Sequence, residues 1–314
     1  MDKGELTHAH NPIILQKIED NRMKKKFKYI FSSIIFGLIL VLMIISFIPK
    51  DETRHDWYYN KLSLDNNISQ NNNILALIDS GYNSNVGFDE ERIIAKYNAI
   101  DDSTDVEDNM GHGTSLLSLI LGIEYKDEAA EGINPYANII IIKAVSDSGY
   151  TTPKIVSKGI EYAIENKASI INISLGTKIY NQELESSIKE AQNNGIIIVS
   201  SVGDTEDDYN TYPARYDGVI AVCAQYYDGE KYILSNKGES SVMIPGVNIK
   251  VLSYDSILQK WQIEKNSGSS ISSVIFVSLL SRVYKIGSNI DYTYLLSCMD
   301  NKEFINYKKI IREG

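Results

Sequence analysis

Cysteine is nearly absent from this chain, which contains two cysteines among 314 residues. Two are too few for a disulfide framework, and the spacing of Cys223 and Cys298 is not that of a metal-binding pair. Because Cys223 falls inside the apolar run 219–224, we expect buried free thiols, with a disulfide between the two residues as the alternative. These counts exclude a small disulfide-rich domain.

An excess of positive charge is missing as well. Lysine and arginine number 31 against 41 aspartates and glutamates, which gives a formal net charge of -10. A chain this acidic is a poor match for a phosphate backbone, and we therefore expect no nucleic acid among its partners. The apolar content of 43% is that of a globular protein long enough for one large domain and an appendage.

Charged residues are missing altogether from residues 29–49, a run dominated by Ile, Leu, Phe, Val and Met. About twenty such residues span a bilayer as a helix. Lysines crowd the stretch before this run and both signs of charge follow it, so the positive-inside rule places the N-terminus in the cytoplasm. We predict a cytoplasmic basic tail at residues 1–28 and a single transmembrane helix at 29–49. A cleaved signal peptide is the alternative, although residues 46–50 lack a small-x-small cleavage site.

Residues 50–72 are polar and rich in asparagine, and they predict a tether with little structure of its own. The remaining chain, residues 73–314, would form one extracytoplasmic domain. The abundance of isoleucine, asparagine, lysine and tyrosine is typical of an AT-rich bacterium. The expected location is therefore a bacterial cell membrane, which the chain crosses once.

Beyond this tether, short apolar runs alternate with helical patterns. Strands are predicted at residues 74–78, 137–143, 170–173 and 196–199. Apolar residues recur at helical spacing over 155–164 and 184–191, and the apolar run 272–283 predicts a buried helix that begins at or just after Ser270. This alternation is typical of an α/β fold, a doubly wound, mostly parallel sheet with helices on both faces.

Three short motifs carry candidate chemistry: Ile-Asp79-Ser-Gly, Gly-His112-Gly-Thr and Gly268-Ser-Ser270-Ile-Ser. A serine hydroxyl is a weak nucleophile, so it needs an imidazole to take its proton and a carboxylate to orient that imidazole. His112 is the candidate base, because His8 and His10 lie in the N-terminal tail and His55 is far from any motif.

Each of these motifs also has an ordinary structural reading. Asp79 directly follows the first predicted strand, where chemistry gathers in parallel sheets, but an Asp-Ser-Gly sequence also suits a turn or a helix cap. His112 lies between two glycines that would suit a turn. Five serines crowd the third motif, and spacing alone does not distinguish them: Ser267, Ser269, Ser270, Ser272 and Ser273.

Taken in order, the motifs resemble the subtilisin-like serine peptidase family. The similarity continues through residues 143–145, 159–163, 171–176, 212–216, 219–222 and 245–247, and covers roughly residues 72–300. The resemblance implies that Asp79 orients the base, that His112 is the general base and that Ser270 is the nucleophile, because residues 268–272 align with the family's Gly-Thr-Ser-Met-Ala.

The resemblance also implies a substrate-binding segment and a pocket beside it. Ile173, Ser174, Leu175 and Gly176 match the extended segment that pairs with the substrate backbone as an added strand. Residues Ser201, Val202 and Gly203 match the lining of the pocket for the residue before the cut. The implied partner is a polypeptide.

One position departs from the family pattern. Where the family has an asparagine whose amide completes the oxyanion hole, this chain has Asp204. A carboxylate only accepts hydrogen bonds and its charge repels an oxyanion, and loss of one donor typically costs about 10²–10³ in turnover. Two explanations stay open: nearby carboxylates keep Asp204 protonated, or the backbone N–H of Ser270 suffices with a slow rate.

No cofactor is expected from these motifs. Residues 122–131 do not reproduce the family's calcium loop, and acidic residues at 101–105 read as solvated loop charge, with calcium as the alternative. The sequence therefore favours a membrane-bound serine endopeptidase that cuts extracytoplasmic polypeptides. The competing hypothesis is a catalytically impaired domain of the same fold that binds peptides or proteins, which Asp204 favours and the complete triad opposes.

Overall fold

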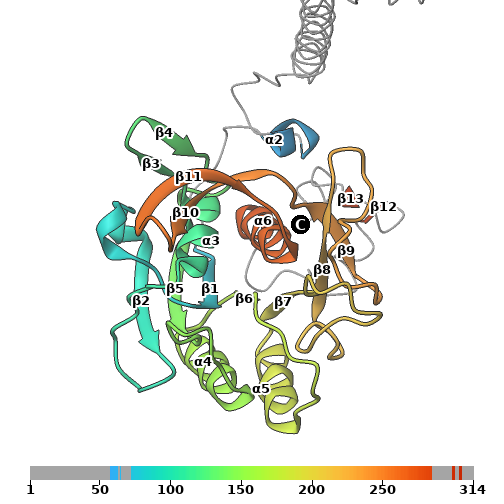
Figure 1. Ribbon diagram of the computed structural model, residues 1–314. Helices are drawn as coiled ribbons and strands as arrows, with labels where there is room; N and C mark the ends of the chain where they lie inside the picture. The colour runs from blue at the N-terminus through green and yellow to red at the C-terminus, as the bar shows by residue number, and fades with distance from the viewer. Residues whose placement is uncertain (1–56, 63, 65–71, 285–298, 301–303, 306–314) are drawn as a thin grey trace, which may run out of the picture. The chain divides into compact units, whose positions relative to one another are not determined.

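The computed structural model describes residues 57–62, 64, 72–284, 299–300 and 304–305 (Figure 1). The chain divides into two units, Met1–Arg54 and His55–Gly314, and the described residues all belong to the second. The predicted tail at 1–28 and the predicted transmembrane helix at 29–49 lie outside them. Among the described helices, none is long and apolar enough to cross a membrane.

A parallel sheet forms the centre of the described domain. Its strand order is β2-β5-β1-β6-β7-β8-β9, and each neighbouring pair is parallel. The strands are β1 (Ile74–Asp79), β2 (Ile93–Asn98), β5 (Asn138–Lys143), β6 (Ile170–Ile173), β7 (Ile197–Ser201), β8 (Ile220–Gln225) and β9 (Val242–Pro245). The predicted α/β architecture with a parallel sheet is thus confirmed.

Helices cover both faces of this sheet. On one face lie α3 (His112–Leu121) and α6 (Ser269–Val283), and on the other α4 (Pro153–Glu165) and α5 (Gln182–Asn193). Two 3-10 turns, η1 (Ser84–Val86) and η2 (Glu90–Arg92), precede β2. Within the described residues, three antiparallel pairs lie outside the sheet: β3 (Ile123–Tyr125) with β4 (Glu128–Ala130), β10 (Ile249–Asp255) with β11 (Lys260–Asn266), and β12 (Met299–Asp300) with β13 (Phe304–Ile305).

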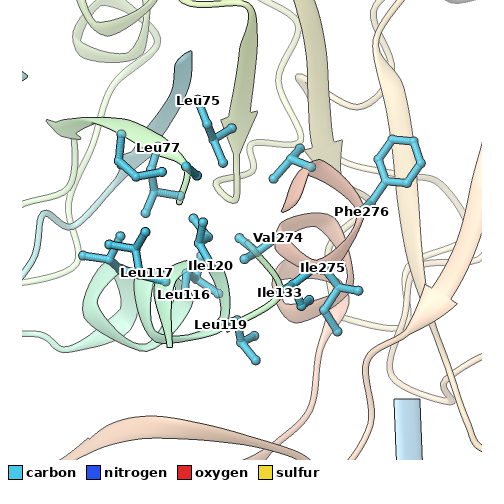
Figure 2. Close-up of a cluster of buried hydrophobic side chains, with 14 of the residues drawn as sticks. Leu75, Leu77, Leu116, Leu117, Leu119, Ile120, Ile133, Val274, Ile275 and Phe276 are labelled. Carbon is cyan, nitrogen blue, oxygen red and sulfur yellow. The ribbon is translucent and has the colours of Figure 1, made fainter. Parts of the chain in front are cut away.

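The alternation of side chains along β1 decides which face carries the chemistry. Leu75 and Leu77 belong to the core cluster that includes α3 and α6, as Figure 2 shows, whereas Ala76 and Ile78 belong to the cluster with α4 and α5. Successive strand residues point to opposite faces, so Asp79 shares the face of Leu75 and Leu77. The carboxylate therefore emerges on the side of the two helices that begin at His112 and at Ser269.

The predicted tether is wrong for residues 57–62. These residues form the short helix α2 (Trp57–Lys61) and its end, and they pack against the domain. The Tyr58 side chain is fully buried, and the Trp57 Nε1–H donates to the Val247 carbonyl at 3.0 Å. Three consecutive aromatic residues gain too much by burial to stay in solvent, which makes the predicted domain start at residue 73 too late.

The buried thiol expected at Cys223 is confirmed, because this residue is a free cysteine within β8. Cys298 lies outside the described residues. Burial raises the pKa of the Cys223 thiol, which keeps it neutral and unreactive.

Candidate active site

Asp79 and His112 form a hydrogen-bonded pair in which the aspartate is buried and the histidine is partly exposed. Asp79 ends β1 with only 1% of its surface exposed, and its Oδ1 lies 2.7 Å from His112 Nδ1. A carboxylate only accepts, so Nδ1 carries the proton and Nε2 is left free to act as a base. The Ser80 N–H also donates to Asp79 Oδ1, at 2.8 Å, which fixes the carboxylate in its plane.

Both glycines of the Gly-His-Gly motif are required by close approaches to the backbone or to the β10–β11 hairpin. A Cβ atom on Gly113 would lie 2.2 Å from the carbonyl oxygen of Gly81, and one on Gly111 would lie 2.6 Å from Cβ of Tyr254. Gly111 also has a φ of 90°, which side chains rarely adopt. The motif therefore brings His112 against β1 on one side and the hairpin on the other.

Asp108 holds the turn before His112, although it lies outside the three sequence motifs. Its carboxylate is fully buried and accepts from the backbone N–H of Met110, Gly111 and Thr114 and from the Thr114 hydroxyl, at 2.7–3.1 Å. These bonds satisfy donors at the start of α3 that have no acceptor within the helix. The sequence feature that could have predicted this role is the position of Asp108, six residues before the threonine of Gly-His-Gly-Thr.

Lys143 is a second residue that the sequence reading did not assign to the site. It ends β5 beside Asp79, and its buried Nζ donates to the Ser80 carbonyl at 2.9 Å and to Asp147 at 2.8 Å. The ammonium group thus fixes Ser80, the residue that follows Asp79. The apolar run before Lys143 predicted a strand but gave no reason for the lysine.

Surrounding carboxylates set the protonation of His112. Partial burial of the ring lowers its pKa, but the charge and the hydrogen bond of Asp79 raise it, with smaller contributions from Asp108 and Asp204. The net result is a pKa of His112 above the usual 6.5. The imidazolium that forms when a base accepts a proton is therefore stabilised in this site.

The structure distinguishes Ser270 from its four neighbouring serines. Three of the others are fully buried and donate elsewhere: Ser269 to Asp204, Ser272 to the Ile244 carbonyl and Ser273 to the Ser270 carbonyl. Ser267 Oγ accepts from the Asn248 N–H. Ser270 is half-buried at the second position of α6 and lines a cavity of about 290 Å³ together with His112.

This cavity is the candidate reaction chamber. Its wall is formed by the turn before α3, the hairpin residues Ser253 and Tyr254, the start of α6, and Asp204. Among the described residues, the structure records no hydrogen bond within 3.5 Å between His112 and Ser270; catalytic contacts of this kind often tighten only when substrate binds. At the second helical position, the Ser270 N–H has no acceptor within the helix, so it can donate to an oxyanion.

Asp204 points at the first turn of α6. Its Oδ2 accepts from the Ser269 N–H at 2.7 Å and from the Ser269 hydroxyl at 2.9 Å, and its Oδ1 accepts from the Ser235 hydroxyl at 3.0 Å. The carboxylate of Asp207, three residues further along the chain, instead forms an ion pair with Lys178 at 2.8 Å. The geometry thus gives Asp204 a role as hydrogen-bond acceptor.

The predicted substrate-binding residues divide into two groups. Ile173, Leu175 and Gly176 line a second cavity of about 300 Å³, while the buried Ser174 hydroxyl turns inward and lies 3.0 Å from the Ser273 hydroxyl. The predicted pocket residues Ser201, Val202 and Gly203 are absent from the lining of both cavities described here. Gly203 instead donates its N–H to the Ser269 hydroxyl at 3.2 Å.

Among the described residues, no group of three or more His, Cys, Asp or Glu side chains is placed to hold a metal ion. In the acidic stretch 101–105, Asp102 pairs with Lys158 at 2.8 Å and Asp101 accepts from the Ser103 N–H. Residues 122–131 contain the β3–β4 hairpin. The carboxylates of Asp101 and Asp102 thus serve a turn and an ion pair.

A parallel α/β sheet that brings His112, held by the buried Asp79, and Ser270 at the start of a helix to one cavity resembles the site of subtilisin-like serine hydrolases. The sequence profile of the subtilase family matches residues 64–278, more than half of the chain. The chain therefore belongs to the subtilase family.

Three relatives illustrate the similarity. The chain is 34% identical over 176 residues to a thermostable alkaline protease of Halalkalibacterium halodurans, an overlap of 56% of this chain and 48% of the relative. It is 31% identical over 177 residues to the minor extracellular protease Epr of Bacillus subtilis (56% of this chain, 27% of the relative). It is 27% identical over 173 residues to thermitase of Thermoactinomyces vulgaris (55% and 62%).

The matches thus span between about a quarter and three fifths of these relatives. Among solved structures, a cold adapted subtilisin-like serine proteinase aligns with a TM-score of 0.65 at 21% identity. That alignment covers 82% of this chain and 96% of the other, and it supports the fold.

Proposed function

We propose that this protein is a serine endopeptidase that hydrolyses peptide bonds through Asp79, His112 and Ser270. The observation that carries the proposal is the 2.7 Å contact between buried Asp79 and His112, on a cavity that Ser270 also lines. Sequence similarity to named proteases supports the same reaction.

Each residue has a defined step in this mechanism. Ser270 Oγ attacks the carbonyl carbon of the substrate while His112 Nε2 takes its proton, and the Ser270 N–H donates to the oxyanion. His112 then gives that proton to the leaving amine, which leaves an acyl-enzyme. A water that loses a proton to His112 attacks the acyl carbon. The ester bond to Ser270 Oγ then breaks, the proton returns from His112 to Oγ, and the carboxylic acid product leaves the restored enzyme.

The second cavity indicates the kind of substrate that this face would bind. It adjoins Leu175 and Gly176 and is lined by apolar and aromatic side chains, which include Tyr150, Val156 and Tyr212. A peptide added as a strand beside residues 173–176 would place a side chain over it. We therefore expect a preference for a bulky apolar residue upstream of the cut.

We further propose that the chain acts at a bacterial membrane on extracytoplasmic peptides or proteins, bound there by residues 29–49. The charge-free apolar run at 29–49, with lysines before it, supports the anchor. A peptidase bound to a membrane would process substrates emerging at the same membrane.

A fluorophosphonate probe tests the enzymatic proposal on the full-length chain. We expect covalent labelling of the wild type and none of Ser270→Ala. Ser267→Ala is the matched control, because Ser267 lines the same cavity and should leave labelling unchanged. Co-flotation of the chain with liposomes, lost when residues 29–49 are deleted, tests the membrane proposal separately.

A second candidate function is peptide binding without hydrolysis. It is favoured by the carboxylate of Asp204 at the position of an oxyanion donor. Failure of the wild type to label at any pH between 5 and 9, while Asp204→Asn labels, would support this binding function.

A further inference from the structure

The nucleophile helix α6 begins without a capping side chain of its own. Gly268 precedes its first residue and makes no side-chain cap. The first N–H groups of a helix have no acceptor within it, so they need one from elsewhere. An acceptor for these N–H groups matters especially in α6, because the second residue of this helix is Ser270, the proposed nucleophile.

Asp204 supplies that acceptor from a position 65 residues away in the chain. Its Oδ2 receives both the backbone N–H and the hydroxyl of Ser269, at 2.7 and 2.9 Å. A Cβ atom on Gly268 would lie 3.0 Å from this same oxygen, so glycine at that position lets the carboxylate approach. A negative charge is also favoured at the positive end of a helix.

The loop that carries Asp204 is held firmly in this orientation. Ser235 donates to Asp204 Oδ1 at 3.0 Å. The next residue, Asn236, is fully buried and bonds the backbone on both sides of Asp204: its Nδ2 donates to the Val202 carbonyl, its N–H donates to the Gly203 carbonyl, and its Oδ1 accepts from Thr205. The carboxylate is therefore placed by contacts with two other segments of the fold, the start of α6 and residues 235–236.

We propose that Asp204 is the N-terminal cap of α6 and, through it, a positioning residue for Ser270, with Ser235 holding the cap in place. This inference deepens the proposed peptidase function and rests on it for the consequence at Ser270. It also accounts for an acid at this position: the carboxylate secures the helix start, and the adjacent Ser270 N–H is left for the oxyanion. An asparagine would keep the acceptor and add a donor, whereas an alanine would remove both.

Two substitutions separate capping from charge. In the full-length chain, Asp204→Ala should lower Tm by about 2–4 °C and label with fluorophosphonate no faster than the wild type. Asp204→Asn should keep the wild-type Tm and label about 10- to 100-fold faster, because its amide restores a donor. Asp208→Asn is the matched control: it removes the same charge from an exposed residue of the same loop, and neither quantity should change.

The outcomes that overturn the proposal are distinct from those that overturn the enzymatic function. An unchanged Tm in Asp204→Ala overturns the cap, and faster labelling of Asp204→Ala than of the wild type overturns the positioning role. If neither the wild type nor Asp204→Asn is labelled, the peptidase function and the role at Ser270 both fail, while the Tm comparison still decides whether Asp204 caps α6.

Discussion

Gly113 and Gly81 meet backbone to backbone. A Cβ atom on Gly113 would lie 2.2 Å from the Gly81 carbonyl oxygen, in a contact between the start of α3 and the turn after β1. These two segments carry His112 and Asp79. Their 2.7 Å hydrogen bond therefore depends on a helix and a strand that approach more closely than any side chain would allow.

Replacement of Gly113 by alanine should consequently destabilise the fold and separate the pair. We expect a loss of about 3 kcal/mol or more in the free energy of unfolding, because the clash is with backbone that has no room to move. Gly149→Ala is the control, since a Cβ there meets nothing within 4 Å and only its positive φ of 78° costs energy, about 1–2 kcal/mol. Urea unfolding of both variants measures the difference, and equal losses would contradict the close-contact argument.

The activity should rise with pH through a midpoint above 6.5. His112 must be neutral to act as a base, and neighbouring carboxylates raise its pKa. Asp204→Asn removes one of these charges, so the midpoint of kcat/KM against pH should move to lower pH. Because the pKa of His112 is higher in the folded state than in the unfolded state, protonation of His112 stabilises the fold. This stabilisation is complete below the unfolded pKa of about 6.5 and disappears as pH rises through the folded-state pKa. A midpoint at or below 6.5 in the wild type would contradict the expectation.

Asp79→Asn should preserve the fold but leave the imidazole in the wrong tautomer. The amide would offer an N–H toward Nδ1, and kcat should fall about 10⁴-fold, as in other Ser-His-Asp triads. Asp101→Asn changes the same group type at an exposed turn and should leave kcat unaltered. Steady-state hydrolysis of a chromogenic peptide measures both, and a loss below tenfold in Asp79→Asn would show that the pair does not drive catalysis.

The docking of α2 predicts a stability effect far from the active site. Tyr58 is fully buried, so Tyr58→Ala should lower the free energy of unfolding by about 3 kcal/mol or more. Tyr136 is 47% exposed, and Tyr136→Ala should change it by about 0.5 kcal/mol or less. If chemical denaturation gives Tyr58→Ala the same small effect, α2 is not part of the folded domain.

Several strands of the central sheet could be predicted from local patterns of apolar residues. The strands at 74–78, 137–143, 170–173 and 196–199 correspond to β1, β5, β6 and β7, because buried parallel strands are short continuous apolar runs. The helix Trp57–Lys61 could not be predicted, because its surroundings are rich in asparagine and its aromatic residues are buried by partners distant in sequence, such as Val247.

The sequence by itself determined the three motifs, their order and the candidate base: His112 is flanked by the two glycines that its close packing requires, and in the sequence no other histidine lies between glycines. Among the five serines, the family resemblance favours Ser270, and only the tertiary structure gives the physical reason: the hydrogen bonds of the other four involve residues such as Asp204 and Ile244. It also decided what Asp204 does. The chemistry of a side chain follows from its residue type, but its hydrogen-bond partners depend on how elements that are distant in sequence pack together.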